Sequence, residues 1–259
     1  MFETKSSKDQ FKNQRAFIVG NGPSLAFTDL DKLNQEISLG SNGVALVFEK
    51  TKWRPTVYSC IDSAVLVDRM EEINGLILEL TESQFYFPKQ VWNDSNPPEI
   101  LKVEEIIYQR KNTTFFDTIP HQITNNAFTS FSPELEKYLV TGTTVTVTLI
   151  QLAVLMGCNP IYLVGCDSHY VIPENAREKN ADTDRVDKVL VLDEDNDPNH
   201  FDPRYFGKDR LWHTPNVHLM IQQYEKVKEA CDQRGFEIYN ATIGGKLEVF
   251  PRVKFDSLF

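Results

Sequence analysis

The chain has 259 residues, of which 41% are hydrophobic and 25% charged, and its formal net charge is −10 at pH 7. This length allows one large α/β domain or two small ones, and it suffices to bury most of the apolar surface without disulfides or metals. The acidic balance excludes a non-specific nucleic-acid binder, which needs a basic surface. It does not exclude an anionic small ligand, because a local site can oppose the global charge.

Four widely spaced cysteines show no metal-ligand spacing, so we expect them to be reduced and buried. The first fifteen residues are polar and lack the apolar core of a signal peptide. Residues 139–166 carry no charge, but glycine, proline and polar residues interrupt them. A core helix followed by a core strand is therefore favoured over a membrane span. We expect a cytoplasmic protein without a membrane span.

In chain order, short apolar runs alternate with helical patterns. The predicted strands are 16–20, 37–44, 55–62, 159–167 and 236–242, with one or two more within 75–80 and 83–88. The predicted helices are 24–34 with Ser24 near its N-cap, 63–74, 143–156, and one that starts at Thr214-Pro215 and ends at Gly235.

Two stretches depart from this alternation. Residues 93–140 have only patchy periodicity and are expected to form a small insert. Residues 173–212 are hydrophilic and acidic at first and are expected to form a lid-like loop. The remaining pattern predicts a single domain over 1–259, a doubly wound, mostly parallel α/β fold of the Rossmann-like type.

Polar residues gather where the predicted strands end. These ends read GNGPS (20–24), SNG (41–43), CIDS (60–63), VGCDSHY (164–170) and YNAT (239–242). Each alone is ordinary turn chemistry. Ligands of open α/β sheets bind outside the carboxyl ends of the strands, so five such ends together predict a ligand site.

The first turn, Gly20-Asn21-Gly22, begins like a dinucleotide-binding motif. However, Leu25 replaces the third glycine, and Asn42 stands where an acid would hold the ribose. There is no G-K-[ST] motif either, so NAD binding and Walker-type ATP binding are both excluded. What remains is a tight turn whose backbone N–H groups and Asn21 side chain can approach a ribose or a phosphate.

Residues 141–144, TGTT, open a predicted helix with free N–H groups and three hydroxyls. Anion binding and a plain threonine cap both fit such a helix start. The stretch 192–202 is acidic but lacks the glycine and terminal glutamate of an EF-hand loop. A solvated lid is therefore favoured there over a metal site.

His213 directly precedes the predicted Thr214 cap. The positive end of the helix dipole should keep its imidazole neutral, as a general base must be. A histidine that only fixes the loop by hydrogen bonds is the alternative. His121, His200 and His218 have no local context that raises them above surface or structural use.

With these motifs the chain resembles the small bacterial sialyltransferases, which use CMP-sialic acid on a single domain that is a variant of the GT-A glycosyltransferase fold. The resemblance lies in GNGPSL, Asn42, TGTT, IYLVGCDSHY and His213. The tail segments HFDPRYFGK, WHTPNV and YNATIGGKLEVFPRV are similar to the related MptE-like and Maf-type flagellin-modifying transferase domain family. Together the two resemblances cover most of the chain outside about 70–138.

The resemblance implies a role for each matching residue. The implied nucleotide-binding residues are Asn21, Gly22, Ser24, Asn42, Asp62, Thr143, Thr144, Gly165 and Asp167. Tyr170 and Tyr205 would hydrogen-bond the departing phosphate, and His213 would deprotonate the acceptor hydroxyl. The implied partners are a nucleotide-sugar donor and a glycan acceptor, with no nucleic acid, no metal and no cofactor.

Two positions depart from the sialyltransferase pattern on the acceptor side. Leu139-Val140 replace an arginine, and Asp62 replaces an asparagine. The donor sugar thus stays open among sialic acid, another nonulosonic acid and the sugar of another nucleotide.

The leading hypothesis is a glycosyltransferase that moves a nonulosonic-acid-like sugar from a CMP donor to a glycan or glycoprotein hydroxyl in cell-surface polysaccharide biosynthesis. One alternative is an MptE-like pyrophosphokinase that uses ATP and Mg²⁺ on a hydroxymethylpterin. Another is a non-catalytic nucleotide-binding module. Peripheral membrane association and a homo-oligomer are open.

Overall fold

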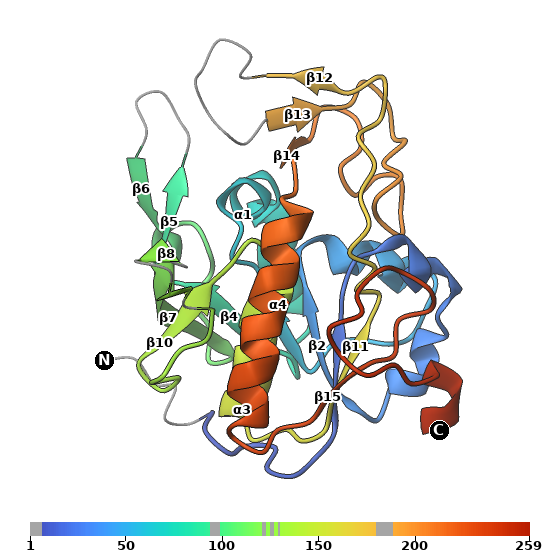
Figure 1. The fold of residues 1–259 in the computed structure, drawn as a ribbon. Helices are drawn as coiled ribbons and strands as arrows, with labels where there is room; N and C mark the ends of the chain where they lie inside the picture. Colours follow the sequence, from blue (N-terminus) through green and yellow to red (C-terminus); the bar gives the residue numbers. More distant parts are fainter. Residues whose placement is uncertain (1–6, 94–98, 121–122, 125–126, 129, 180–188) are drawn as a thin grey trace.

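The computed structural model describes residues 7–93, 99–120, 123–124, 127–128, 130–179 and 189–259. Its centre is an eight-stranded sheet of order β10-β7-β4-β3-β2-β1-β11-β15, in which every pair of neighbours is parallel (Figure 1). The strands are β1 (Ala16–Val19), β2 (Ile37–Ser41), β3 (Val57–Ser59), β4 (Gln84–Pro88), β7 (Thr113–Pro120), β10 (Tyr138–Thr141), β11 (Ile161–Val164) and β15 (Ile238–Asn240). The order reverses between β1 and β11, which confirms the predicted doubly wound α/β fold.

The sheet is buried on both faces. Ala16 and Ile18 of β1 belong to one core cluster, whereas Phe17 and Val19 belong to the other, because side chains alternate along a strand. Helices α3 (Val145–Leu155) and α4 (Val217–Asp232) pack in the first cluster. Helices α1 (Ser63–Asp68) and α2 (Met70–Glu79) pack in the second. The 3₁₀ segments are η2 (Pro23–Phe27), η3 (Leu30–Leu33), η4 (Asn42–Glu49), η5 (Val103–Glu105) and η6 (Phe255–Leu258).

The uncharged stretch 139–166 begins with the last residues of β10 and continues with the core helix α3 and the core strand β11, the helix and strand that were predicted. In the described part of the chain, no helix combines the length and the apolar character that crossing a membrane requires. All four cysteines are free and buried, as expected.

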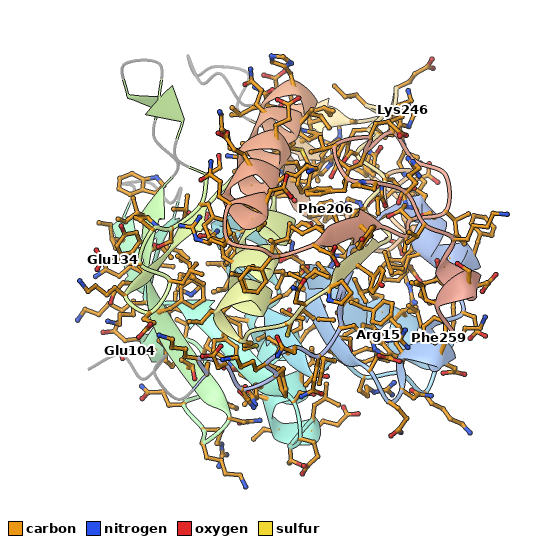
Figure 2. The ribbon with its side chains drawn as sticks, turned by 60° about the horizontal axis from the view of Figure 1, so that its bottom comes forward. Arg15, Glu104, Glu134, Phe206, Lys246 and Phe259 are labelled. Atoms are coloured by element: carbon orange, nitrogen blue, oxygen red, sulfur yellow. The ribbon has the colours of Figure 1, made fainter. Side chains whose placement is uncertain are left out.

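The C-terminal segment returns to the start of β1. Arg15 Nη1 donates to the carbonyl of Leu258 at 2.8 Å, and its guanidinium lies 5.4 Å from the centre of the Phe259 ring (Figure 2). The chain end thereby covers the edge of the second core cluster, where Phe255 is buried.

Two predicted elements were wrong in type. Residues 75–80 belong almost entirely to α2 and form no strand, because Ile73 and Ile77 lie one helical turn apart and both face the core. Residues 24–34 form the 3₁₀ segments η2 and η3 rather than an α-helix. Asp29, not Ser24, supplies the side-chain cap there, by accepting from the N–H of Asp31.

The start of α4 was also placed too early. The helix begins at Val217, and Asn216 is its N-cap, since its side-chain oxygen accepts from the Leu219 N–H at 3.0 Å. Thr214 and Pro215 lie before the helix.

The predicted insert 93–140 is largely part of the sheet itself, because it contributes β7 and β10. Two further antiparallel pairs lie within or next to this stretch: β5 (Gln90–Asn93) with β6 (Glu99–Lys102) precedes β7 in the chain, and β8 (Ile123–Thr124) with β9 (Ala127–Phe128) lies between β7 and β10. Four residues in β10 are too few to show a period, which explains the missed strand.

The lid-like stretch 173–212 contains a small antiparallel sheet of β12 (Arg177–Glu178), β13 (Val189–Val191) and β14 (Leu211–His213). Residues 180–188 of this stretch, and His121, lie outside the described residues. Within the acidic part, Asp193, Glu194 and Asp195 are exposed, whereas Asp197 and Asp202 are only 6% and 2% exposed.

Candidate functional site

A cavity of about 980 Å³ lies at the carboxyl ends of β1, β2, β3, β10 and β11. Its wall contains every residue predicted for the site except Ser24, namely Asn21, Gly22, Asn42, Asp62, Thr143, Thr144, Gly165, Asp167, Tyr170, Tyr205 and His213. The segments after four of the predicted strand ends therefore meet, as expected. The fifth, 239–242, does not line the cavity; Thr242 instead accepts a hydrogen bond from the N–H of Cys166 at 3.0 Å.

Asp167 anchors the turn that follows β1. Ser24 Oγ donates to Oδ2 at 2.7 Å, and the Ser24 N–H donates to Oδ1 at 3.3 Å. Burial raises the pKa of Asp167 above its ordinary value, and the hydrogen bonds from Ser24 oppose that rise. Ser24 thus acts on the cavity through Asp167 rather than by lining it.

Asn21 and Asn42 follow neighbouring strands, and each leaves its amide oxygen buried without a hydrogen-bond partner in the described structure. Asn21 Nδ2 donates to the carbonyl of Ser41 at 3.2 Å. Asn42 has a φ of +52°, a conformation that asparagine tolerates better than most residues. Buried oxygens without partners are rare in folded proteins, so each of these amides leaves an acceptor unused within the described structure.

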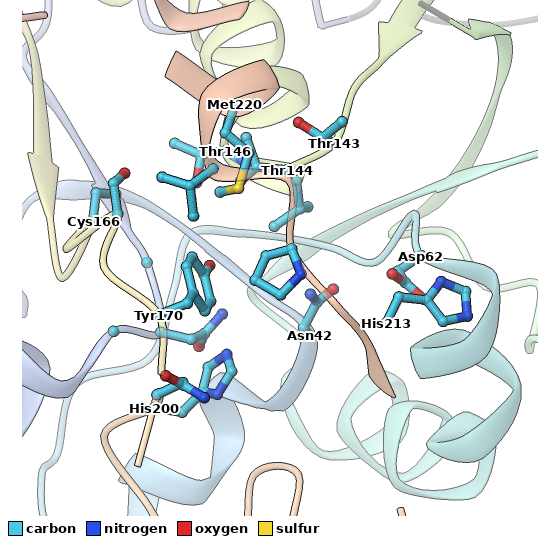
Figure 3. Close-up of a pocket in the computed structure, with 18 of the residues that line it drawn as sticks. Asn42, Asp62, Thr143, Thr144, Thr146, Cys166, Tyr170, His200, His213 and Met220 are labelled. Atoms are coloured by element: carbon cyan, nitrogen blue, oxygen red, sulfur yellow. The ribbon is translucent and has the colours of Figure 1, made fainter. Parts of the chain in front are cut away.

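The two predicted phosphate-binding tyrosines differ in their surroundings. Burial raises the pKa of Tyr170 to about 12, so its hydroxyl remains a hydrogen-bond donor at neutral pH. Figure 3 shows its ring between Cys166 and Asn42. Tyr205 is 2% exposed, and burial also raises the pKa of Tyr205. Hydrogen bonds with the Gly43 backbone and the Asn42 side chain lower this pKa and so oppose the effect of burial. The Tyr205 hydroxyl therefore supports the turn after β2.

The TGTT segment is held between α3 and α4. The N–H and Oγ1 of Thr143 both donate to Gln223 Oε1, at 2.8 and 2.9 Å. Thr144 is the N-cap of α3, and its Oγ1 accepts from the Thr146 N–H at 3.4 Å. Of the two roles that the motif allows, the threonine cap is present in the fold.

His213 ends β14 and is half-buried, and it lines the cavity together with Asp62. Asp62 caps α1 by accepting from the Val65 N–H at 3.0 Å. Because α4 starts at Val217, His213 is farther from its dipole than predicted, and that effect fades within the first turn. Asp62 is thus a carboxylate in the same cavity wall, which the sequence pattern did not relate to His213.

His200 lines the same cavity, although sequence reasoning dismissed it. Its Nδ1 lies 2.7 Å from Oδ2 of the buried Asp197, and its ring stacks on Tyr205 with centroids 3.9 Å apart. The Asp-x-x-His spacing was the available signal. It was hidden because the surrounding stretch looked like a solvated acidic loop.

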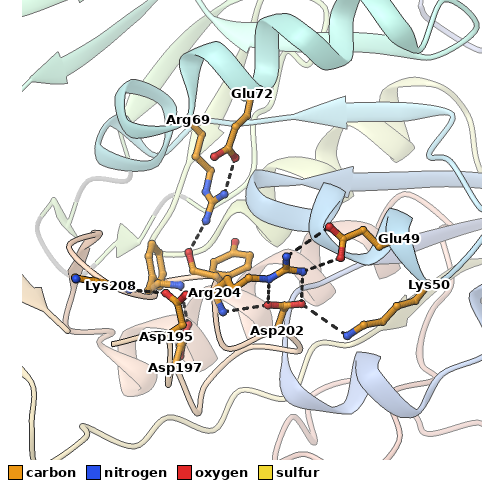
Figure 4. Close-up of polar contacts among 11 residues, drawn as sticks. Glu49, Lys50, Arg69, Glu72, Asp195, Asp197, Asp202, Arg204 and Lys208 are labelled. Atoms are coloured by element: carbon orange, nitrogen blue, oxygen red, sulfur yellow. Dashed lines mark hydrogen bonds and ion pairs between the residues drawn. The ribbon is translucent and has the colours of Figure 1, made fainter. Parts of the chain in front are cut away.

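Carboxylates of the acidic stretch 192–202 accept hydrogen bonds from other groups of the protein. The buried Asp202 accepts two hydrogen bonds from the Arg204 guanidinium, at 2.9 and 3.0 Å, and Asp195 accepts from the Lys208 N–H at 2.8 Å (Figure 4). Across the described ranges, no three His, Cys, Asp or Glu side chains gather as a metal-binding group.

Comparison with known proteins places the fold and the family. No curated protein matches the chain. The solved structure of the Maf glycosyltransferase from Magnetospirillum magneticum AMB-1 matches 100% of this chain and 38% of its own, with a TM-score of 0.50 and 15% sequence identity. The chain thus spans 38% of the length of that transferase, and the likeness is one of fold.

A family model described as 6-hydroxymethylpterin diphosphokinase MptE-like matches residues 2–172. The matched part contains Asn21, Asn42, Asp62, Asp167 and Tyr170, but not the tail segments that carried the resemblance in the sequence. Since the match covers more than half of the residues, the chain belongs to the MptE-like family.

Proposed function

We propose that the chain is a glycosyltransferase that takes its sugar from a nucleotide donor, with a CMP-activated nonulosonic acid as the favoured donor. The observation that carries this proposal is the composition of the cavity. It gathers Asn21, Asn42, Tyr170 and His213, and none of its described lining residues is lysine or arginine. CMP leaves with a single phosphate, which a neutral tyrosine hydroxyl and a helix start can stabilise. A nucleoside triphosphate is usually held by lysine or arginine together with Mg²⁺.

In the proposed step, the bond between the anomeric carbon and the phosphate oxygen breaks, and its electron pair leaves with CMP. The hydroxyl oxygen of a glycan or glycoprotein acceptor bonds to the anomeric carbon, and its proton passes to His213. Tyr170 donates a hydrogen bond to the departing phosphate. No residue in this step requires a metal. The shared fold with a Maf glycosyltransferase supports the reaction class.

The second candidate is a diphosphokinase that transfers pyrophosphate from ATP to a hydroxymethylpterin, because the matching family model carries that description. Mg²⁺-dependent transfer needs carboxylates that can hold the ion. The two aspartates of the cavity are already engaged, Asp62 in capping α1 and Asp167 with Ser24. This engagement favours the glycosyltransferase.

The decisive experiment is a thermal-shift panel of CMP, CDP, UDP, GDP and ATP, each with and without Mg²⁺, on the wild type and on His213→Ala. We expect CMP to stabilise both proteins without Mg²⁺, by about 2.7 kcal/mol at ~100 times its dissociation constant. Transfer from a CMP-sugar should fall by about 10²–10⁴-fold in His213→Ala, because the base is lost.

His218→Ala is the matched control, since His218 is exposed on α4 and outside the cavity. Stabilisation by ATP with Mg²⁺ alone would establish the diphosphokinase instead. Unchanged turnover in His213→Ala would remove His213 from the mechanism. CMP binding without any turnover would indicate a non-catalytic module.

A further inference from the structure

Three contacts hold His200 in the cavity wall. Nδ1 lies 2.7 Å from Asp197 Oδ2, one ring face stacks on Tyr205 at an interplanar angle of 5°, and Phe206 packs edge-on at 5.1 Å. The side chain is 12% exposed, and it lines the cavity. Within the described chain no hydrogen bond engages Nε2, and Nε2 is not among the buried atoms that lack partners. The ring therefore has a fixed position and one accessible nitrogen.

Asp197 determines which nitrogen carries the hydrogen. Its side chain is 3% exposed and also accepts the N–H groups of Asn199, at 2.8 Å, and Phe206, at 3.0 Å. A carboxylate can only accept, so the hydrogen of the Asp197–His200 contact belongs to Nδ1. In the neutral imidazole, Nε2 then carries a lone pair. His200 thus presents a hydrogen-bond acceptor to the cavity.

The segment that carries His200 packs on the turns that follow β1 and β2. The N–H of Phe201 donates to the carbonyl of Asn21 at 3.1 Å, which attaches the segment to the turn after β1. Beneath His200, Tyr205 packs on the turn after β2, where a Cβ on Gly43 would lie 2.7 Å from its ring.

In doubly wound sheets this is where the ribose of a nucleotide lies, and an acid after the second strand commonly accepts its hydroxyl. Here the residue after β2 is Asn42, an amide. His200 brings an acceptor to the same place from a distant segment of the chain.

We propose that Nε2 of His200 accepts a hydrogen bond from a ribose hydroxyl of the donor nucleotide, with Asp197 as the positioning residue. This inference rests on the proposed function only in that the ligand is a nucleotide. It assigns the site a preference for ribonucleotides over the deoxy form that lacks the bonded hydroxyl. Loss of one such hydrogen bond should weaken binding about 10-fold.

Calorimetric titration with CMP, 2′-deoxy-CMP and 3′-deoxy-CMP tests this. His200→Phe keeps a ring on Tyr205 but has no nitrogen. The deoxy compound that lacks the bonded hydroxyl should bind the wild type about 10-fold more weakly than CMP does. The His200→Phe variant should bind CMP as weakly as it binds that deoxy compound. A uniform loss for all three ligands in His200→Phe would show a purely structural ring and overturn the inference. So would equal affinity of the three for the wild type.

His218→Phe is the matched control, since it makes the same change on the exposed face of α4 and should keep the wild-type preference. If His200→Phe does not fold, NMR of the unaltered protein with isotope-labelled histidine decides. CMP should shift the Nε2 resonance of His200, and the discriminated deoxy compound should not. An equal response, or none, would overturn the inference.

Titration with AMP, GMP and UMP and their deoxy forms separates the proposed CMP donor from the proposed contact of His200 with the ribose. If one of these nucleotides binds and CMP does not, the proposal of a CMP donor is wrong. The role of His200 is then tested by comparing that nucleotide with its own deoxy forms. If none of the four binds, both proposals fall.

Discussion

At Gly22 the backbone passes against the carboxylate of Asp167, and a β-carbon there would lie 2.0 Å from Oδ2. That distance is far inside van der Waals contact, so any larger residue would push Asp167 off Ser24. The glycine that looked like part of a dinucleotide motif is therefore required by protein packing, whichever ligand is bound.

We predict that Gly22→Ala destabilises the protein by about 1–3 kcal/mol through overpacking. Nucleotide binding should weaken as well, because Asp167 lines the cavity. Urea unfolding and the thermal-shift panel measure the two effects. Gly75→Ala is the matched control: nothing lies within 4 Å of its added β-carbon. This change in α2 should raise stability by up to ~1 kcal/mol. Equal stability of both variants would contradict the packing argument.

At the scale of elements, Arg69 joins α1 and α2 to the segment that carries Tyr205. The guanidinium is 2% exposed; Nη1 donates to Glu72 at 2.7 Å, and Nη2 donates to the carbonyl of Tyr205 (Figure 4). Glu72 in turn accepts from Arg210 at 2.7 Å, and Arg210 also pairs with Asp68. The segment 205–210, which lies between His200 and His213 in the chain, is thereby attached to α1 and α2.

We predict that Arg69→Met lowers the free energy of unfolding by about 1–3 kcal/mol, because it leaves the buried Tyr205 carbonyl without a donor. Arg210→Met should lower it by only ~0–1 kcal/mol, since the Arg210 side chain is 26% exposed and surface ion pairs contribute little. Chemical denaturation of both variants makes the comparison. A loss in Arg210→Met as large as in Arg69→Met would show that the ion pairs, rather than the carbonyl contact, hold the segment.

At the scale of the whole molecule, both faces of the sheet bury free thiols. Cys158, Cys166 and Cys231 lie in the cluster under α3 and α4, and Cys60 lies in the opposite cluster. Burial raises the pKa of Cys158, Cys166 and Cys231 to about 12. Burial holds the pKa of Cys60 well above its ordinary value too. Both faces of the core are therefore closed to reagents that attack thiolates.

We predict that a disulfide reagent at neutral pH modifies Cys60, Cys158 and Cys231 only as the molecule unfolds globally, because all three are fully buried. Modification should follow the same denaturant curve as the loss of circular dichroism. Reaction of Cys60, Cys158 or Cys231 in the native protein would mean that one core cluster opens on its own.

Much of the fold could be predicted because short stretches of the sequence determine many of its elements. The short apolar runs of β1, β2, β3 and β11 each end in small polar residues, a pattern that needs no distant partner. The site followed from the same rule, since the carboxyl ends of parallel strands meet at one edge of the sheet. The prediction of an element was wrong where the residues around it determine whether it forms a helix or a strand. Residues 75–80 are apolar enough for a strand, yet they continue α2 because Ile73 and Ile77 share a helical face.

The sequence by itself determined the fold class and the five segments in which a site would be sought, and all but one of the site residues that it predicted line the cavity. Tertiary structure alone decided the sheet order, the α4 cap at Asn216, the presence of His213 and Asp62 in one cavity wall, and the place of His200. The physical reason is separation along the chain. Asp197 looks solvated until Phe206, Asn199 and His200 close around it, and His200 belongs to the site only because its segment folds back onto the turn after β1.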